Sequence, residues 1–483
     1  MTPHADTRTK IVATLGPASE TPEVLDEMLR AGVDVVRLNL SHGTLESHLV
    51  RMQAVREAAE RVGQVVAVLA DLPGPKVRSG QFPDGGVQLV GGRPVALAPA
   101  EGAASSAELI TVEYPTLLTD LQPGDRVVLG DGAISLQALA VTDERVECVV
   151  ITGGLVQGRP GVHLPSERLR LTTPTDDDLV LGKAMAEAGA DFLAVSFVRA
   201  AHDLRVVREA ILPCTTRLVA KIETMPAVTN LESIAAEADA VMVARGDLGI
   251  ECPLEDVPHL QKRIIRHCVE VGVPVITATQ MMESMITSPS PTRAEVSDIA
   301  NAVFDGTDAL MLSAETAIGA DPAEVVRTMS RIAGRAEAEA SYAQWASRLG
   351  RSQREAWPDG PGRITMAITH AAGMAAEDSG AQAILCCTTS GRTARAMARF
   401  RPSITLLSLS PDPATVRAMA LSWGVRSLAV STYHTTDELV WFAVERAVQS
   451  GYVEPGQTVL VLAGAPDRPS GASTDVLRIV RVS

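Results

Sequence analysis

Residues 217–223 read Arg-Leu-Val-Ala-Lys-Ile-Glu, a short apolar run that ends in a lysine and a glutamate. A run of this length and apolarity is typical of a β-strand that is buried on both faces. Eight such runs occur, and each is followed by residues with the amphipathic period of a helix. The runs are Lys10–Leu15, Val33–Leu40, Val65–Asp71, Phe192–Phe197, Leu218–Ile222, Ala240–Ala244, Pro274–Thr277 and Ala309–Leu312. Alternating strands and helices predict a parallel sheet, and eight such units predict a closed (β/α)8 barrel.

Two further domains are expected. Between the third and fourth runs, Gly80–Pro165 contains Gly- and Pro-rich turns between strands of period two, which indicates an inserted all-β domain. Its entry through Pro73-Gly-Pro75 suggests a hinged lid. After residue 340 a polar stretch leads to four more strands, alternating with helices, at Ala383–Thr388, Thr405–Leu409, Ser427–Val430 and Val459–Ala463. The predicted domains are a catalytic barrel (1–74 and 168–342), an inserted β-barrel lid (75–167) and a C-terminal α/β regulatory domain (343–483).

The composition excludes several classes of protein. A net charge of −15 argues against a nucleic-acid partner and against a membrane surface, both of which favour a basic face. No apolar run reaches the roughly 18 residues that a membrane span needs. The six cysteines include no CxxC pair, and residues 1–10 have no apolar core that directs export. We therefore expect a cytoplasmic protein.

Lysine is scarce in this chain. Only five of the 43 basic residues are lysines, and two of them, Lys221 and Lys76, lie at the ends of predicted strands or directly after them. An ammonium is a compact point charge, whereas a guanidinium is a wide planar fork. A pocket that needs a small cation beside a phosphoryl group cannot simply use arginine.

The ends of the predicted strands carry polar side chains. In a (β/α)8 barrel the carboxyl ends of the strands form one rim, where the active site lies. This rim combines cations, carboxylates and hydroxyls, the set that phosphoryl transfer requires, and two carboxylates with water and substrate oxygens suit Mg²⁺ or Mn²⁺. No His/Cys cluster suits zinc. The rim residues are Arg37, Arg78, Lys221, Glu223, Asp247, Thr279 and Ser313.

Longer motifs extend this pattern over nearly the whole chain, which resembles the pyruvate kinase family. The matching stretches begin with Thr9-Lys-Ile-Val-Ala-Thr-Leu-Gly-Pro-Ala-Ser19, Arg37-Leu-Asn-Leu-Ser-His-Gly43, Ala220-Lys-Ile-Glu223 and Val241-Met-Val-Ala-Arg-Gly-Asp-Leu-Gly249. They continue with Ala278-Thr-Gln-Met-Met-Glu-Ser-Met285, Pro291-Thr-Arg-Ala-Glu-Val-Ser-Asp298 and Met311-Leu-Ser-Ala-Glu-Thr316. Motifs of this length in this order are highly specific.

The resemblance implies transfer of a phosphoryl group from phosphoenolpyruvate to ADP in glycolysis, and it implies roles for the rim residues. Lys221 neutralises the charge of the phosphoryl group during transfer, while Glu223 and Asp247 hold the divalent metal. Arg37 binds the phosphate. Backbone amides around Ala244, Arg245 and Gly246 hold the substrate carboxylate, and Thr279 lies against the reacting carbon, with Ser313 and Glu315 nearby in the network that delivers a proton.

The resemblance also implies a nucleotide site at Asn39, His42 and Arg78, with a second divalent ion arriving with ADP. Many family members need K⁺, held by positions that match Asn39, Ser41, Asp71 and Leu72. Here Lys76 replaces the glutamate that accompanies K⁺ dependence, in Asp71-Leu-Pro-Gly-Pro-Lys76. Because a tethered ammonium can supply the positive charge, we expect activity without K⁺. The lid segment from Arg159 to His163 also departs from the family pattern.

In the C-terminal domain Thr388-Thr-Ser-Gly-Arg-Thr393 follows a strand and opens a predicted helix. Hydroxyls and free amides at such a point can cradle a phosphate, and in the family this loop binds a phosphorylated activator together with a loop that matches Arg468–Asp475. The alternative is a capped helix start without a ligand. The family also implies a homotetramer.

Two other functions remain open from the sequence. The chain could be another barrel enzyme acting on phosphoenolpyruvate or pyruvate, which would share the metal site but would not need a lid or a nucleotide-facing Arg78. It could also be a catalytically silent sensor of metabolites, but such a protein is expected to have lost Lys221 or a metal carboxylate.

Overall fold

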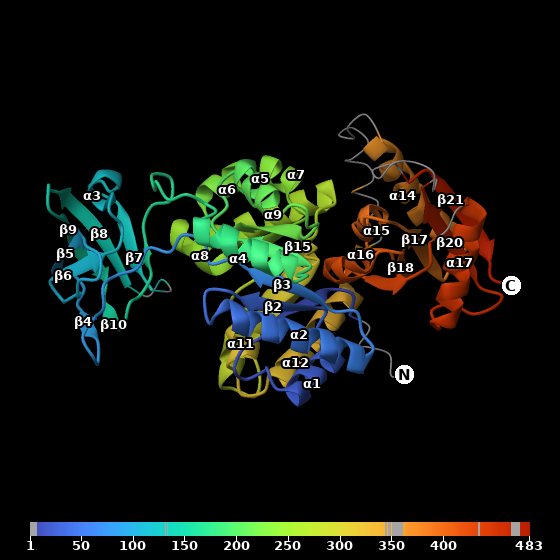
Figure 1. Ribbon diagram of the computed structural model, residues 1–483, viewed down its shortest axis with the longest axis horizontal. Coiled ribbons are helices and arrows are strands. Elements are labelled where there is room, and N and C mark those ends of the chain that lie inside the picture. Colours follow the sequence, from blue (N-terminus) through green and yellow to red (C-terminus); the bar gives the residue numbers. More distant parts are fainter. Residues whose placement is uncertain are drawn as a thin grey trace.

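The computed structural model describes residues 7–130, 132, 134–342, 345, 349, 361–432, 435–464 and 474–483. Figure 1 shows three bodies along the longest axis: a sheet-rich domain on the left, a barrel with its helices in the centre and an α/β domain on the right. Within the described ranges, no helix has the length and apolarity needed to span a bilayer.

The central body is the predicted closed barrel. Its strands pair in parallel in the order β1-β16-β15-β14-β13-β12-β3-β2, so the fold prediction is confirmed. All eight strands overlap the predicted runs, and nearly all their apolar side chains are buried. The strands are β1 (Lys10–Thr14), β2 (Val35–Asn39), β3 (Ala67–Asp71), β12 (Phe192–Val195), β13 (Arg217–Ile222), β14 (Ala240–Ala244), β15 (Val275–Ala278) and β16 (Ala309–Leu312).

Helices surround this barrel. They are α1 (Pro22–Ala31), α2 (Leu45–Val62), α4 (Asp176–Glu187), α5 (Ala201–Ala210), α6 (Met225–Thr229), α7 (Leu231–Glu237), α8 (Arg245–Glu251), α9 (Val257–Val271), α10 (Arg293–Asp305), α11 (Ala314–Ala317) and α12 (Pro322–Glu339), with 3-10 turns η1 (Leu254–Asp256) and η2 (Glu283–Ile286). Local sequence fixes where several begin. Thr175 and Asp178 form a capping box at the start of α4. Asp178 also accepts a hydrogen bond from the Gly74 amide at 3.0 Å, which ties this cap to the entry of the lid.

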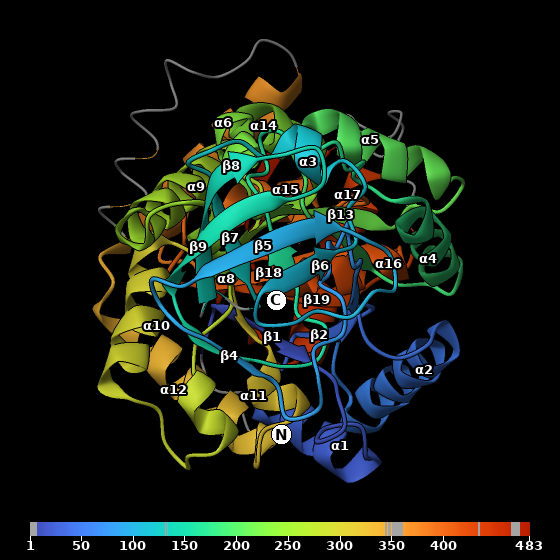
Figure 2. The ribbon, with the colours of Figure 1, turned by 90° about the vertical axis from the view of Figure 1, so that its left-hand side faces the viewer.

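The lid contains β4 (Val87–Leu89), β5 (Pro94–Pro99), β6 (Leu109–Val112), α3 (Leu117–Asp120), β7 (Arg126–Leu129), β8 (Ile134–Val141), β9 (Val146–Thr152), β10 (Gly154–Val156) and β11 (Val162–His163). We expected a β-barrel. The described strands form a six-stranded sheet, β11-β7-β8-β9-β5-β6, and a separate pair, β10-β4. Arg78 and Ser79 connect the two edges of the larger sheet through isolated bridges, to Gly161 beside β11 and to Val112 of β6. The two sheets share one apolar core without a hydrogen-bonded ladder to join them. Seen from the lid side, these strands cross in front of the barrel (Figure 2).

The C-terminal domain has a five-stranded sheet in the order β19-β18-β17-β20-β21. Four strands match the predicted runs: β17 (Ala383–Cys387), β18 (Thr405–Ser410), β19 (Val425–Ala429) and β20 (Thr458–Ala463). The fifth, β21 (Val476–Arg481), is an antiparallel edge strand that the sequence did not predict. The helices are α14 (Pro361–Asp378), α15 (Arg392–Ala398), α16 (Pro413–Ala418) and α17 (Thr436–Gln449), with the 3-10 turn η3 (Met419–Leu421).

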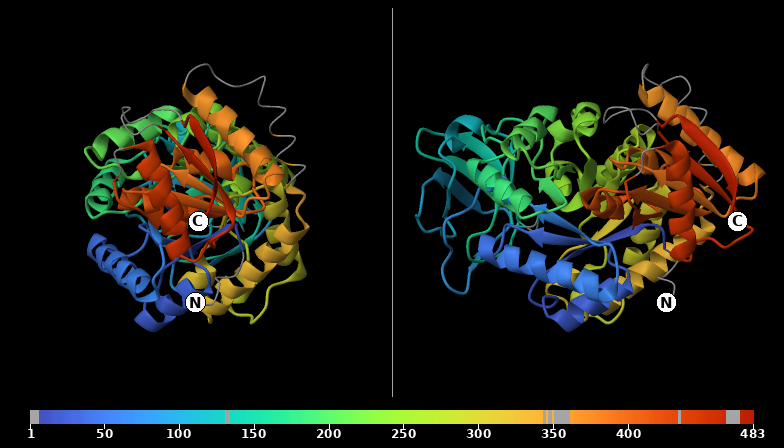
Figure 3. Two further views of the ribbon diagram at one scale, coloured as in Figure 1. Left: turned by 90° about the vertical axis from the view of Figure 1, so that its right-hand side faces the viewer. Right: turned by 45° about the vertical axis from the view of Figure 1, so that its right-hand side comes forward.

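This domain packs against the amino ends of the barrel strands (Figure 3). Arg401 pairs with Asp308, directly before β16, at 2.9 Å, and Arg417 pairs with Asp191, directly before β12, at 2.7 Å. The lid strands lie at the other side of the barrel in Figure 1. The barrel therefore separates the lid from the C-terminal domain.

The lid core has no room for a side chain at Gly80. A Cβ atom there would lie 1.9 Å from the Ala103 carbonyl oxygen and 2.1 Å from Thr111 Oγ1. We expect Gly80→Ala to destabilise the lid by about 1–3 kcal/mol, because the backbone must shift. Amide hydrogen exchange in the β6 peptide should rise accordingly.

The matched control is Gly91→Ala, where the new Cβ would lie 3.5 Å from the nearest atom, the Ile151 carbonyl oxygen. Its lid should exchange like the wild type, within about 0.5 kcal/mol. Equal protection in both variants would contradict the packing seen around Gly80.

Candidate active site

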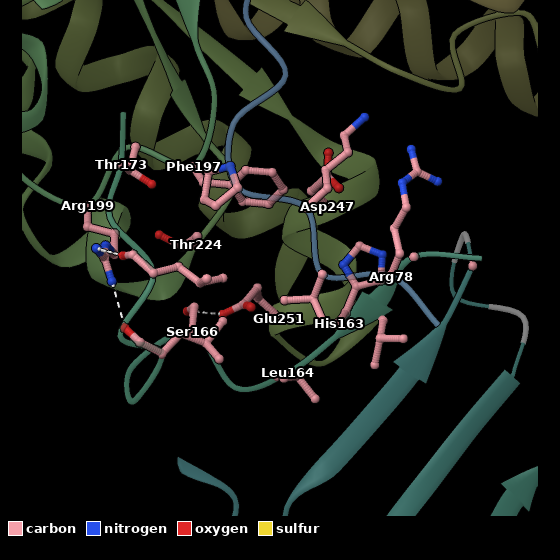
Figure 4. Close-up of a pocket in the computed structure, with 18 of the residues that line it drawn as sticks. Arg78, His163, Leu164, Ser166, Thr173, Phe197, Arg199, Thr224, Asp247 and Glu251 are labelled. Atoms are coloured by element: carbon pink, nitrogen blue, oxygen red, sulfur yellow. Dashed lines mark hydrogen bonds between the residues drawn. The ribbon is translucent and has the colours of Figure 1, made fainter. Parts of the chain in front are cut away.

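The polar rim faces a cavity of about 330 Å³ between the barrel and the lid. His42, Lys76, Arg78 and Asp247 line it among the predicted site residues. The lid contributes Gly130, Gly161, Val162, His163 and Leu164. Figure 4 shows Asp247 and Arg78 near each other, with His163 of the lid below them. The segment in which the sequence departed from the family pattern therefore forms part of the cavity wall.

Asp71, at the end of β3, joins two cations of the rim. Its carboxylate lies 2.7 Å from Arg37 and 3.3 Å from Lys221, and the residue is 1 % exposed. Burial by itself raises the pKa of this carboxyl, but the charges of Lys221 and Arg37 outweigh burial and hold the pKa below its usual range. Asp71 is therefore ionised and orients both cations.

Lys221 comes from β13 and is held by three oxygen atoms. Its Nζ donates to Ser196 Oγ at 2.7 Å and lies 2.9 Å from Glu223 Oε1, in addition to Asp71. Burial acts to lower the pKa of Lys221, but Asp71, Glu223 and Asp247 raise it above its ordinary value. The ammonium is thus permanently charged and fixed in position.

Glu223 follows the same strand, two residues after Lys221, so both side chains project to one side. One carboxylate oxygen accepts from the Phe197 amide at 2.6 Å, and the other, Oε1, is buried 2.9 Å from the Lys221 ammonium. Burial raises the pKa of this carboxyl, Lys221 opposes the shift and Asp247 adds to it. A buried oxygen with spare acceptor capacity, facing a second carboxylate, fits a divalent cation. Among the residues described, no three His, Cys, Asp or Glu side chains converge, so other ligands would come from water or substrate.

The turn after β15 has a strained backbone. Thr279 and Gln280 have φ values of 70° and 54°, which are unusual for residues other than glycine. The Arg245 guanidinium holds this turn through Nη2 to the Thr279 carbonyl (2.6 Å) and Nε to the Ala278 carbonyl (3.2 Å). Nη1 is anchored on Asp298 at 2.6 Å.

Helix α8 begins beside this turn, at Arg245. The Gly246 amide donates to Thr279 Oγ1 at 2.9 Å, so the first turn of α8 and the Thr279 hydroxyl are in direct contact. The dipole of a helix start favours an anion at this point, where the Gly246 amide is already used by Thr279 Oγ1.

Glu315 links the last two strand ends. Its two oxygens accept from the Ser313 amide at 2.6 Å and from the Met282 amide at 3.1 Å, and the residue is buried. In this structure Glu315 acts as a brace between the loops after β15 and β16, with Ser313 at the start of α11.

The residues predicted for a monovalent cation, or its lysine substitute, also come together. Lys76 Nζ donates to Ser41 Oγ at 2.8 Å, and the Ser41 amide donates to Asn39 Oδ1 at 3.2 Å. Burial lowers the pKa of Lys76, as do Lys221 and Arg78, while Asp247 and Asp71 act in the opposite direction. The Leu72 carbonyl accepts from Ser196 Oγ at 2.8 Å and so belongs to the Lys221 network.

His42 and Arg78 lie on the same wall. Burial lowers the pKa of His42, and Lys76, Arg78 and Arg37 lower it further, so the imidazole is neutral near pH 7. Arg78 Nη1 donates to the Arg159 carbonyl at 3.2 Å, within the lid.

The loop Thr388–Thr393 lies in the C-terminal domain, away from this rim. Thr388 Oγ1 accepts from the Gly391 amide at 2.9 Å, and Thr393 Oγ1 contacts Thr474 Oγ1 at 2.6 Å. The predicted partner loop Arg468–Asp475 lies mostly outside the described residues; Thr474 and Asp475 are the part that can be placed.

Sequence reasoning assigned no role to three features of the site. Ser196 orients Lys221, and its position at the end of β12 was the available signal. The Arg245 side chain clamps the strained turn, which no spacing revealed. Ser166 of the lid bonds Glu251 of α8, and Arg199 donates to the Leu169 carbonyl at 3.0 Å, so two contacts fasten the returning lid strand (Figure 4).

A closed parallel barrel with a lysine fixed between carboxylates at its carboxyl rim, beneath a lid, defines a barrel enzyme of the phosphotransferase class. Two family models match the chain. They are "Pyruvate kinase, barrel domain" over residues 6–326 and "Pyruvate kinase, alpha/beta domain" over residues 366–480. The chain belongs to the pyruvate kinase family.

Individual relatives agree. The chain is 40% identical to a pyruvate kinase of Geobacillus stearothermophilus over 99% of its own length and 80% of that protein. It is 36% identical to one of Clostridium acetobutylicum over 98% and 99% of the two chains. A crystal structure of a pyruvate kinase from Cryptosporidium parvum superposes with a TM-score of 0.90 at 32% identity, covering 99% of this chain and 97% of the other.

The Arg245 clamp gives a test of the strained turn. Replacing it by methionine keeps most of the volume but removes the bonds to the Ala278 and Thr279 carbonyls. We expect Arg245→Met to lower kcat by about 10²-fold, because a displacement of roughly 1 Å at a reacting group has that effect. Steady-state kinetics measures it, with thermal unfolding to check that the fold persists.

The control is Arg293→Met, at the exposed start of α10. It should leave kcat unchanged. An Arg245→Met enzyme with wild-type kcat would show that the turn holds its conformation without the guanidinium.

Proposed function

We propose that the rim transfers the phosphoryl group of phosphoenolpyruvate to ADP and then protonates the enolate to pyruvate. The observation that carries the proposal is the fixed ammonium of Lys221, held by Asp71, Glu223 and Ser196 beside Arg37. During transfer the bond from phosphorus to the enol oxygen breaks, and a β-phosphate oxygen of ADP forms the new bond. Negative charge on the transferred group is what preorganised cations stabilise.

The substrate would lie between Arg37, Lys221 and the start of α8. Arg37 and Lys221 contact the phosphoryl oxygens, and the amides of Ala244–Gly246 receive the carboxylate. Pyruvate kinases depend in general on Mg²⁺, and here Glu223 and Asp247 would hold the Mg²⁺ or Mn²⁺ ion. Once bound, the ion neutralises charge on the carboxylate and enolate oxygens.

The protonation step would use the opposite wall. The Thr279 hydroxyl accepts from the Gly246 amide at 2.9 Å and donates to the Ala278 carbonyl at 2.6 Å, so it lies beside the proposed position of the substrate. Ser313 and Glu315 support Thr279 through the braced loops after β15 and β16.

ADP would enter the cavity under the lid. A volume of about 330 Å³ is within the range of small-molecule sites. The phosphates would meet Arg78, with the neutral His42 and the Asn39 region at the wall, and a second divalent ion would arrive with the nucleotide.

Replacing Lys221 tests the reaction and separates an enzyme from a silent sensor. We expect Lys221→Ala to lower kcat by about 10³-fold or more, because a charge that acts in the transition state is lost. Production of pyruvate from phosphoenolpyruvate and ADP with Mg²⁺ measures it. Binding of Mn²⁺, followed by electron paramagnetic resonance, should persist.

A matched control is Lys262→Ala, a half-exposed lysine of α9 paired with Asp305. It should keep wild-type turnover. If the wild type itself formed no pyruvate, even with sugar phosphates and AMP present, the sensor hypothesis would replace the proposal.

We further propose that Lys76 makes the enzyme independent of K⁺. Its ammonium contacts Ser41 and is attracted by the charges of Asp71 and Asp247. The family resemblance predicts a monovalent cation beside these residues. A tethered charge needs no ion to be taken from solution.

Lys76→Glu should make the enzyme dependent on K⁺. We expect equal wild-type rates in KCl and in tetramethylammonium chloride, because Lys76 supplies the charge. The variant should lose about 10²-fold in tetramethylammonium and recover part of it in K⁺, because the vacated position lacks a cation.

Lys183→Glu on the exposed face of α4 reverses a charge elsewhere and should respond to neither salt. A wild-type enzyme that is active only with K⁺ would disprove the role of Lys76 and leave the reaction intact.

The proposal includes an effector site in the C-terminal domain. Thr388, Thr389, Ser390, Gly391, Arg392 and Thr393 would bind a phosphorylated effector, a proposal supported by the hydroxyls of the loop and the contact from Thr393 to Thr474. The family further suggests a cytoplasmic homotetramer, which sedimentation with and without sugar phosphates can measure.

A further inference from the structure

A second, much smaller cavity lies in the seam between the barrel and the C-terminal domain. It measures about 10 Å³, which is room for one water-sized species. The barrel side comes from the end of α9 and from Asp308. The other side comes from α15 and the residues after it, Arg395, Arg399 and Arg401, and from Ser422.

Three polar atoms of residues that line this cavity have no hydrogen-bond partner among the residues that the structure describes. They are Arg399 Nη2, Arg401 Nε and Ser422 Oγ, and their residues are 4 %, 2 % and 1 % exposed. Buried polar atoms are nearly always satisfied by protein, water or an ion. Guanidinium nitrogens can only donate, so a shared partner must be an acceptor.

The charge around the cavity is unbalanced. Asp308 is the carboxylate among the lining residues, and its oxygens are already used by Arg401 (2.9 Å) and by the Val275 and Trp423 amides (3.0 and 3.3 Å). Arg399 donates only to carbonyls, of Ala396 and Glu270, among its described hydrogen bonds. Burial lowers the pKa of Arg399 to about 10, and no carboxylate opposes this shift.

Arg395 adds a third cation. Burial also lowers its pKa to about 10, with Asp239 opposing and Arg217 reinforcing the shift. Three guanidinium groups therefore line the cavity together with one carboxylate, that of Asp308, while Asp239 acts on Arg395.

We propose that this seam binds a monatomic anion, of which chloride is the abundant example. A cation is excluded by the donors and the net charge. A phosphate or carboxylate group is excluded by the size of the cavity. A water molecule could accept from two donors but would leave the charge uncompensated, which is unfavourable inside a protein.

The position of the anion gives it a structural consequence. Helix α15 begins at Arg392, within the loop Thr388–Thr393, and Asp308 leads into β16, which Ser313 follows. The bound anion would hold these two elements together across the seam, so its loss would loosen the attachment of the C-terminal domain.

The first experiment locates the ion. Crystals of the full chain soaked in sodium bromide should give an anomalous peak between Arg399, Arg401 and Ser422. An ordered water there without anomalous signal, or an empty cavity, would overturn the proposal.

The second experiment compares stability in solution. At equal ionic strength the unfolding midpoint of the wild type should be about 2 °C higher in sodium chloride than in sodium gluconate, whose anion is too large for the cavity. Arg399→Met should lose this difference because it removes an unpartnered donor and a charge. Arg263→Met, exposed on α9, should keep it.

An equal chloride effect in all three proteins would mean a general salt effect and contradict the site. If Arg399→Met failed to fold, Ser422→Ala replaces it, and its bromide peak should be weaker than that of the wild type. An unchanged peak in Ser422→Ala would remove the hydroxyl from the site and overturn the three-donor arrangement.

Discussion

The contact between Asp71, Lys221 and Glu223 is the constraint on which the rest of the site depends. Three charged groups are withdrawn from water, and each is tolerable only because the others are present. Removing one partner from such a buried arrangement costs about 3–5 kcal/mol, because an uncompensated charge remains. Asp71 comes from β3 and the other two from β13, with β12 between them in the sheet. The network thus requires the strands of the barrel to be in register, and the barrel in turn fixes the network.

Other groups of the rim are also held in place by neighbouring residues. Ser196, directly after the intervening β12, accepts from Lys221 and donates to the Leu72 carbonyl, so it joins the lysine to the end of β3. The turn at Thr279 is different, because its backbone is strained and relies on the Arg245 guanidinium. Strain of this kind persists only where neighbouring groups enforce it. The fixed ammonium of Lys221 lies at one side of the site, and the strained turn at Thr279 lies at the other. This arrangement suits a reaction that needs a fixed cation and a hydroxyl held in one orientation.

Much of this could be predicted from the sequence, for physical reasons that differ by element. The barrel strands were predictable because burial on both faces makes them continuously apolar. Lys221 and Glu223 were predictable as a pair, since residues two apart on a strand share a side. Strand β21 was missed because it is an edge strand whose sequence, Val-Leu-Arg-Ile-Val-Arg, is partly exposed and carries two arginines. The Arg245 clamp depends on carbonyls in an unusual conformation, and no residue pattern specifies those.

The two ends of the barrel have different functions, and this separation limits how a ligand at one end can affect the other. Carboxyl ends of the strands bear the charged rim, while amino ends begin beside Asp191 and Asp308, which pair with Arg417 and Arg401 of the C-terminal domain. A ligand in that domain has no direct path to the rim except through the barrel or through another subunit. Close-packed strands transmit little unless an element has two alternative arrangements. Among the described residues, the seam holds three buried donors that have no hydrogen-bond partner, so rearrangement there would disturb few completed contacts. Any influence of the C-terminal domain on the rim is therefore expected to begin with movement at the seam, with β12 and β16 carried as rigid units.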